Sequence, residues 1–302
     1  MKIKGTPVTP EMTARQLVQS FASVGFQASE LNRAAGVLNA MTADKATVFL
    51  AFTSNLASSG LREHIAQLCR EKRVHAIITG VGSMEEDLMK ATGGFELASF
   101  SEDDAKLRKQ GVNRIGNIIA SNALYEQLEK TLKPFFAKAF AESKGAPLSP
   151  SEMFAQLGRA VSDENSFLHW ASRNGIPVFC PAPTDGAFGL NALYFKQDHP
   201  NFTIDVVGDL QRLATLTLAT KKTGALVLGG GFAKHHAIGI NLIRGGLDYA
   251  VYVTTATEFD GSLSGARCRE AVSWGKIKPG ARTAYVQCDA TIALPLLMAA
   301  WE

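Results

Sequence analysis

The sequence lacks the features that mark membrane-spanning, secreted and metal-binding proteins. It contains no run of about 18 apolar residues, so we expect no membrane span. Its start, MKIKGTPVTPEM, has no apolar stretch of the kind found in secretion signals. The four cysteines are widely spaced, with no CxxC or Cys/His pattern: Cys69, Cys180, Cys268 and Cys288. We therefore expect reduced thiols, no metal ion and a cytoplasmic location.

A strong excess of charge is missing as well. Lysine and arginine number 31 against 28 aspartates and glutamates, a net charge of +3. The basic residues are scattered and are not interleaved with aromatic ones, which argues against a nucleic-acid partner. The hydrophobic share is 46% of 302 residues, as in ordinary globular proteins with a substantial core. No linker or repeat is visible, and we predict one domain over residues 1–302.

Apolar strands alternate with helical stretches along most of the chain. We predict strands at 45–53, 74–82, 176–181, 225–228, 249–254 and 283–288. Helices are predicted at 61–70, 84–91, 122–144, 150–161, 202–220, 235–243 and 292–301, with residues 101–117 as a polar loop. An N-terminal helical segment, about 10–42, should pack on the main body. The pattern predicts an α/β fold with a Rossmann-like, mostly parallel sheet and helices on both faces.

Polar residues and glycines follow most of the predicted strands. Ligands of open α/β sheets bind outside the carboxyl ends of the strands. The residues at these ends are Thr53, Ser54, Asn55, 80–82, Asp185, 229–231, Thr255, Ala256, Asp289 and Ala290. Their convergence predicts one binding cleft.

Lys276 is the strongest candidate for a reactive group. It directly follows Trp274 and Gly275, and Glu270 lies six residues before it. A lysine becomes nucleophilic only when burial or nearby positive charge keeps it unprotonated, and an indole wall would help to exclude water. The indole face and a carboxylate would also attract an amine substrate. A surface lysine before a Lys-Pro-Gly turn is the simpler alternative.

A second candidate element is ALVLGGGFAKHH, from Ala225 to His236. It has the order of a buried strand, a glycine loop and a helix start, which brings backbone N–H groups against a phosphate. The loop is neither GxGxxG nor a Walker sequence, and a simple tight turn is the alternative. A histidine at its mouth, His235, is a candidate acid–base group.

Together these stretches resemble deoxyhypusine synthase, and the resemblance covers most of the chain. The earlier landmarks are Gly25 to Ala28, Thr53 to Leu56, Glu85 to Leu88, Asn113 to Asn117, Ile176 to Phe179 and Thr184 to Gly186. The longest and most specific ones follow in family order as GGGxxKHH, EFDGSxSGAR and EAVSWGK.

The resemblance implies an NAD-dependent transferase with a recycled cofactor. In this family NAD oxidises spermidine beside its secondary amine, and the aminobutyl group passes, with loss of diaminopropane, to an active-site lysine. It then moves to a lysine of the hypusine-containing translation factor, and hydride returns from NADH. By motif, Lys276 would form the imine, His235 would shuttle protons or hold the amine, and Glu270 and Trp274 would flank it. NAD would be surrounded by Thr53, Ser54, Asn55, Glu86, Asp185, Gly229, Gly230, Thr255, Ala256, Asp260, Ser264, Asp289 and Ala290. For Asp260 and Asp289, turn formation is the structural alternative.

Three positions depart from the family pattern. Leu263 and Leu190 replace aspartates with which the family grips the ammonium groups of spermidine, and Gly239 replaces an asparagine. An ammonium group buried there without a partner would cost on the order of several kcal/mol. The altered pocket predicts a donor or acceptor amine other than conventionally bound spermidine.

Other interpretations remain open. The chain could be a true deoxyhypusine synthase whose pocket acids come from other positions, or an inactive, NAD-binding regulatory paralogue. A plain NAD dehydrogenase would accumulate NADH, whereas a transferase returns the hydride. Retention of Lys276 argues against an inactive protein. The resemblance also implies a homotetramer with active sites at a dimer interface.

Overall fold

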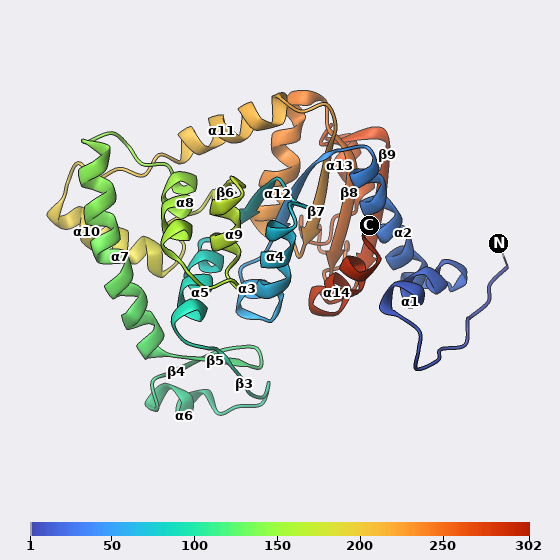
Figure 1. Ribbon diagram of the computed structural model, residues 1–302, viewed down its shortest axis with the longest axis horizontal. Helices are drawn as coiled ribbons and strands as arrows, with labels where there is room; N and C mark the ends of the chain where they lie inside the picture. The colour runs from blue at the N-terminus through green and yellow to red at the C-terminus, as the bar shows by residue number, and fades with distance from the viewer. Residues whose placement is uncertain (1) are drawn as a thin grey trace. The chain divides into compact units, whose positions relative to one another are not determined.

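The structure, a computed structural model, describes residues 2–302 (Figure 1). These residues form two units, each with most of its contacts within itself. Unit 1 consists of residues up to Thr53, Arg73–Ile78 and Arg212–Glu302, and unit 2 of Ser54–Lys72 and Thr79–Gln211. The single domain over residues 1–302 stays a prediction.

Unit 1 is built on a parallel sheet. Its strands β2, β1, β7, β8 and β9 lie in that order, and β1, β7, β8 and β9 pair in parallel. Pairing aligns Thr47 of β1 with Thr223 of β7, and Leu226 of β7 with Val251 of β8. Nearly every residue of β1, β7 and β8 is buried, which requires cover on both faces of the sheet. The elements are α1 Ala14–Ser20, η1 Phe21–Ser23, α2 Phe26–Ala43, β1 Thr47–Phe52, β2 Ala76–Thr79, β7 Thr223–Leu228, α12 Gly231–Gly239, η2 Ile240–Arg244, β8 Leu247–Thr254, α13 Cys268–Ser273, β9 Ile277–Gln287 and α14 Ala290–Ala300.

Two tyrosines of β8 show which helices supply that cover. The hydroxyl of Tyr249 donates to Asp44, the residue that ends α2. The Nζ of Lys234, a residue of α12, lies over the Tyr252 ring, 4.4 Å from the ring centroid. Side chains three residues apart on a strand point to opposite faces, so α2 and α12 cover opposite faces (Figure 1). The predicted Rossmann-like sheet with helices on both faces is confirmed.

The two ends of unit 1 are joined to each other. A capping box at Thr13 starts α1, which packs against α14. The indole N–H of Trp301 donates to the hydroxyl of Thr42 at 2.8 Å, across 259 residues of sequence. The guanidinium of Arg73 lies 5.5 Å from the Trp301 ring centroid and donates to the Trp301 carbonyl oxygen. The N-terminal helices therefore belong to the same core as the last residues.

Unit 2 is mainly helical. A small antiparallel sheet has the order β3-β5-β4. Phe136 of α7 is fully buried, with Phe188, Phe202 and Phe195 between 5.0 and 5.9 Å away by ring centroids. The elements are α3 Asn55–Ser58, α4 Leu61–Arg70, α5 Val81–Thr92, β3 Glu96–Leu97, α6 Asp104–Lys109, β4 Val112–Ile115, β5 Ile118–Ser121, α7 Asn122–Ser143, α8 Pro150–Ala160, α9 Phe167–Arg173, β6 Val178–Phe179 and α10 Ala187–Asp198; α11, Val206–Leu218, has residues in both units.

A buried ion network links α4, α5 and the segment before α9 in unit 2. Arg62, only 2% exposed, donates to Asp87 at 2.6 Å and to Asp163 at 2.6 Å. Ser166 donates to the other oxygen of Asp87. These bonds satisfy an arginine that would be very costly to bury alone.

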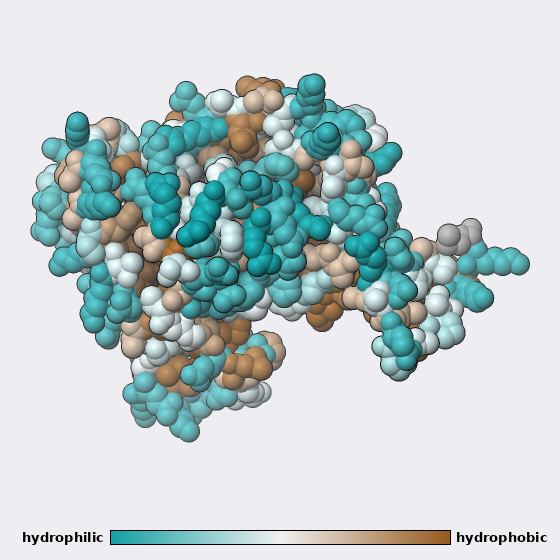
Figure 2. All heavy atoms as spheres, in the orientation of Figure 1, coloured by the Kyte–Doolittle hydropathy of each residue, from teal (hydrophilic) through white to brown (hydrophobic). Residues whose placement is uncertain are grey.

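One sequence-based expectation was wrong. Residues 101–117 are not a loop, because Asp103 caps α6 and a tight turn at Gly116, φ +62°, joins β4 to β5. The N-terminal helical segment consists of α1, η1 and α2, with an interruption near Gly25 between η1 and α2. No helix among residues 2–302 is long and apolar enough to cross a membrane. On the face drawn in Figure 2, hydrophilic residues predominate and hydrophobic ones form small areas.

Candidate active site

Lys276 lies at the junction of α13 and β9, where its main chain is held on both sides. Its N–H donates to Ala271 at 2.9 Å, and its carbonyl oxygen accepts from Leu247 at 3.0 Å. Gly275 supplies the left-handed turn between the elements, with φ +68°. The side chain is 9% exposed, and its Nζ lies 5.2 Å from the ring centroid of Trp274. The indole, itself 66% exposed, therefore shields the amine on one side.

A small cavity adjoins this lysine. Its volume is about 20 Å³, which holds about one water molecule. It is lined by Lys234, Ile238, Tyr252, Leu263, Ala266, Arg267, Glu270, Ala271, Trp274 and Lys276. The structure thus brings together four residues selected from the sequence: Lys276, Trp274, Glu270 and Leu263. An amine, an indole, a carboxylate and an apolar side chain share one pocket.

Two other selected residues of unit 1 do not line the cavity. His235 is exposed on α12, and Gly239 is the last residue of that helix. The neighbouring His236 is half-buried, and burial together with the charge of His235 lowers its pKa. Asn241, which remains where the family has its second asparagine, is buried and accepts from Thr223 at 2.9 Å.

The sequence interpretation missed Lys234 and Tyr252 in the cavity wall. Lys234 is 1% exposed, and burial lowers its pKa to about 8. Tyr252 is also 1% exposed, and burial raises its pKa well above the ordinary value. Within residues 2–302 the Tyr252 hydroxyl has no hydrogen-bond partner. The available signal was helical spacing, because Lys234 shares a face with Ala237 and Ile238, both buried.

The glycine loop closes against the segment that precedes α13. Gly229 and Gly231 have φ values of +85° and +61°, which favour glycine. A Cβ on Gly230 would lie 2.4 Å from the hydroxyl oxygen of Ser264. That oxygen accepts from the N–H of Gly231 at 3.0 Å. A Cβ on Gly229 would lie 2.8 Å from the hydroxyl of Thr53, so four selected residues lie together at the end of β7.

The remaining selected residues of unit 1 are held by local hydrogen bonds. The N–H of Ala256 donates to Thr254, next to Thr255. Asp260 accepts from the N–H of Ser262 at 2.8 Å. Asp289 caps α14, accepting from the N–H of Thr291 at 2.7 Å, and Ala290 begins that helix. Both carboxylates therefore make the local bonds that turn formation would require.

Unit 2 carries the other selected residues: Ser54, Asn55, Glu86, Asp185 and Leu190. Glu86 is 9% exposed, and its Oε2 accepts from the Ser58 hydroxyl at 2.6 Å. Burial, together with the charge of Glu85, raises the pKa of Glu86 to about 7, although the Ser58 bond lowers it. Burial likewise raises the pKa of Glu85, and the charge of Asp185 adds to this effect. Leu190 is 55% exposed on α10.

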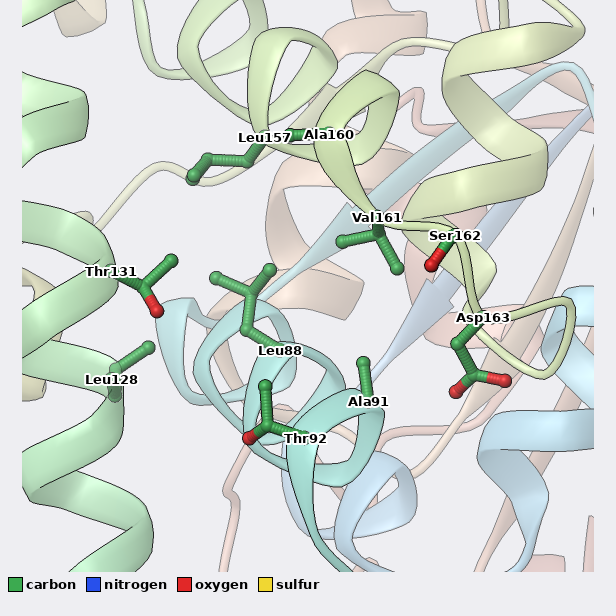
Figure 3. A pocket seen from close by; sticks show the side chains of 10 residues that line it. All are labelled: Leu88, Ala91, Thr92, Leu128, Thr131, Leu157, Ala160, Val161, Ser162 and Asp163. Atoms are coloured by element: carbon green, nitrogen blue, oxygen red, sulfur yellow. The ribbon is translucent and has the colours of Figure 1, made fainter.

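A larger cavity of about 190 Å³ in unit 2 contains none of the selected residues (Figure 3). Leu88, Leu128 and Leu157 form its walls, and Asp163 of the ion network stands at one side. Within residues 2–302 no cluster of His, Cys, Asp and Glu could hold a metal ion.

Known proteins similar to this chain match it over almost its whole length. The family model for deoxyhypusine synthase matches residues 16–301. The deoxyhypusine synthase of Neurospora crassa is 42% identical over 315 residues, covering 99% of this chain and 88% of its own. That of Nicotiana tabacum is 40% identical over 336 residues, with 99% and 88% covered. A crystal structure from Entamoeba histolytica assigned as this enzyme has a TM-score of 0.72 and 27% identity, covering 99% and 96%. The chain belongs to the deoxyhypusine synthase family.

Proposed function

We propose that this protein is an NAD-dependent aminoalkyl transferase in which Lys276 forms the imine, acting on an amine other than conventionally bound spermidine. Its relatives named deoxyhypusine synthase support the transferase class. The observation that carries the proposal is the placement of Lys276. Its amine is nearly buried against an indole, in a pocket that also contains a carboxylate and a leucine. Such surroundings keep water away from one side of the nucleophile and leave the amine facing the pocket.

The glycine loop is where we propose that NAD binds. A strand that ends in glycines and leads into a helix suits a dinucleotide phosphate, because the backbone can approach closely. Gly229 and Gly230 belong to this loop in unit 1, and Ser264 packs against it from the segment before α13. NAD would accept the hydride from the amine substrate and return it. The chain's own residues orient the substrate and exclude water around Lys276.

In the transfer step, the Lys276 amine attacks the C=N carbon of the oxidised substrate. The bond from that carbon to the leaving nitrogen breaks, and a proton must reach the leaving amine. Glu270 lines the pocket and is placed to hold the positively charged end of the substrate. His235, exposed on α12, is the proposed proton carrier.

Leu263 and Leu190 are the basis for proposing a different amine. Leu263 forms part of the cavity wall and cannot pair with an ammonium group, which leaves Glu270 as the one carboxylate among the residues that line the cavity. An amine with fewer charges or an apolar tail fits this wall better. Deoxyhypusine synthase activity itself, toward a lysine of the hypusine-containing translation factor, is the second candidate. It is favoured by the identities near 40% to enzymes of that name.

Borohydride trapping tests the mechanism. Protein with NAD and each of a panel of amines is reduced, and the adduct is located by intact mass and peptide mapping. We expect an adduct on Lys276, whose mass names the transferred group, and none on Lys276→Ala. Lys278→Ala is the matched control, because Lys278 pairs with Asp248 outside the cavity. Trapping or turnover that persists in Lys276→Ala would refute the mechanism.

The leucines are tested by their reversal. Leu190→Asp with Leu263→Asp should increase the use of spermidine relative to other amines. Leu193→Asp, at a similarly exposed position of α10, is the control and should not. A folded double variant with no gain would contradict the role of these leucines. An aminobutyl adduct from spermidine on the unaltered protein would favour the second candidate.

The proposal includes a cytoplasmic homotetramer with active sites at a dimer interface. The exposed Trp274 beside the cavity is consistent with cover by another copy. Light scattering and cell fractionation measure the mass and the location.

A further inference from the structure

Lys234 is buried in the wall of the Lys276 cavity, and the proposed mechanism gives it no role. Helix α12 places it 1% exposed, with its Nζ over the ring of Tyr252. An ammonium group is costly to bury unless hydrogen bonds replace its water. Its two hydrogen-bond acceptors therefore indicate what this lysine does.

Both acceptors belong to one short segment. The Nζ donates to the carbonyl oxygen of Leu263 at 2.7 Å and to that of Ala266 at 2.7 Å. Residues 263–266 lie outside any helix or strand, so no regular backbone ladder holds them. One ammonium group thus bridges the two ends of the segment.

The same segment is fixed from other directions. The Gly231 N–H donates to the Ser264 hydroxyl, and Gly230 leaves no room between the loop and Ser264. A Cβ on Gly265 would lie 1.6 Å from the carbonyl oxygen of Thr257. The segment therefore connects the glycine loop on one side with the Lys276 cavity on the other, through Ser264 and Leu263.

We propose that Lys234 is a positioning residue, whose ammonium group holds residues 263–266 against the glycine loop and so fixes Leu263 as a wall of the Lys276 cavity. It acts through the segment and not on the reacting atoms. Loss of the group should free the wall, weaken selection among amines and leave Lys276 chemically competent. The selectivity arm of this inference rests on the proposed function, whereas the structural arm does not.

Hydrogen exchange tests the structural arm. In Lys234→Met the two carbonyl bonds are lost, and we expect exchange in peptides covering 257–267 to be about tenfold faster or more. Peptides from β7 and β8 should be unchanged. Lys222→Met is the matched control, because it removes a surface pairing with Asp44 in the same unit. Unchanged exchange in 257–267, or a uniform rise across unit 1, would overturn the proposal.

A second variant covers the case in which Lys234→Met does not fold. Lys234→Gln keeps N–H donors on a side chain one atom shorter, which cannot reach both carbonyls. We expect locally faster exchange of 257–267, by several-fold. No local change in this variant would equally overturn the proposal.

Kinetics test the selectivity arm. In Lys234→Gln the KM for the preferred amine should rise several-fold with kcat within about twofold, and trapping on Lys276 should persist. An equal loss of kcat and kcat/KM would contradict a positioning role. If the unaltered protein shows no adduct on Lys276, the proposed function fails, while the exchange result still decides the role of Lys234.

Discussion

The buried carboxyl of Glu86 should make the free energy of unfolding of this protein fall as the pH rises. Its carboxyl is buried, and its pKa is raised from the ordinary 4.5 to about 7, mainly by burial. Between these two pH values the unfolded chain loses the proton while the folded chain keeps it. Stability is therefore lost as pH rises through this window. The difference corresponds to about 3 kcal/mol, at about 1.4 kcal/mol per tenfold change.

Glu86→Gln removes this titration and keeps the shape of the side chain. Urea unfolding from pH 4 to pH 8 would measure the free energy of unfolding of both proteins. The variant should be similar to wild type at pH 4 and more stable by about 3 kcal/mol at pH 8. Groups that do not interact with Glu86 cancel in the comparison, and Glu85 is the neighbouring carboxyl whose charge acts on it.

Ser58→Ala provides an independent check on the same carboxyl. The Ser58 hydroxyl donates to Glu86 and lowers its pKa, so its removal should move the pH transition upward. A free-energy difference between Glu86→Gln and wild type that is constant from pH 4 to pH 8 would refute the reasoning.

Three further substitutions test the packing described above. Arg62→Ala leaves the fully buried Asp87 without its cation and should lower the free energy of unfolding, measured in urea, by about 3–5 kcal/mol. A loss below about 1 kcal/mol would show that the ion network does not stabilise unit 2. Phe136→Ala should cost about 3–5 kcal/mol in the same assay, because it empties the centre of the aromatic cluster, and a neutral effect would contradict close packing there. Gly265→Ala places a methyl group against the backbone of Thr257 and should weaken NAD binding measured by calorimetry; unchanged affinity would show that the segment shifts freely.

The strands and the longer helices could be predicted because their apolar residues recur with a clear period. The strand β7 and the helix α4 lie where the pattern placed them. Residues 101–117 were misread because α6 and β4 are short and polar. Their order depends on a cap at Asp103 and a turn at Gly116, which local chemistry sets. The Gly-Asn turn between two short runs was the signal that could have found this hairpin.

The candidate site also has residues that the sequence could predict and residues that it could not. Glu270, Trp274 and Lys276 lie within seven residues of sequence, so their proximity followed from the motif and the short helix α13. Lys234 was missed because a lysine in a sequence is ordinarily a surface residue, although its spacing from Ala237 and Ile238 indicated the buried face of α12. Its two hydrogen-bond partners could not be predicted, because they depend on how α12 meets residues 263–266. His235 and Gly239 lie outside the cavity lining, to which α12 contributes Lys234 and Ile238 from another side of the helix.

The joining of the two chain ends in unit 1 has a consequence for biosynthesis. Strand β1, with the uncharged sequence TVFLAF, pairs with β7. Thr42, just before β1, accepts the hydrogen bond of the Trp301 indole. On the ribosome, the whole of unit 2 emerges before β7 or Trp301 does. During that interval the edge of β1 that later pairs with β7 is exposed and unpaired. An unpaired apolar strand edge is the kind of surface that aggregates or recruits a chaperone. This edge of β1 therefore stays unpaired until β7 has been synthesised, more than 150 residues later in the sequence.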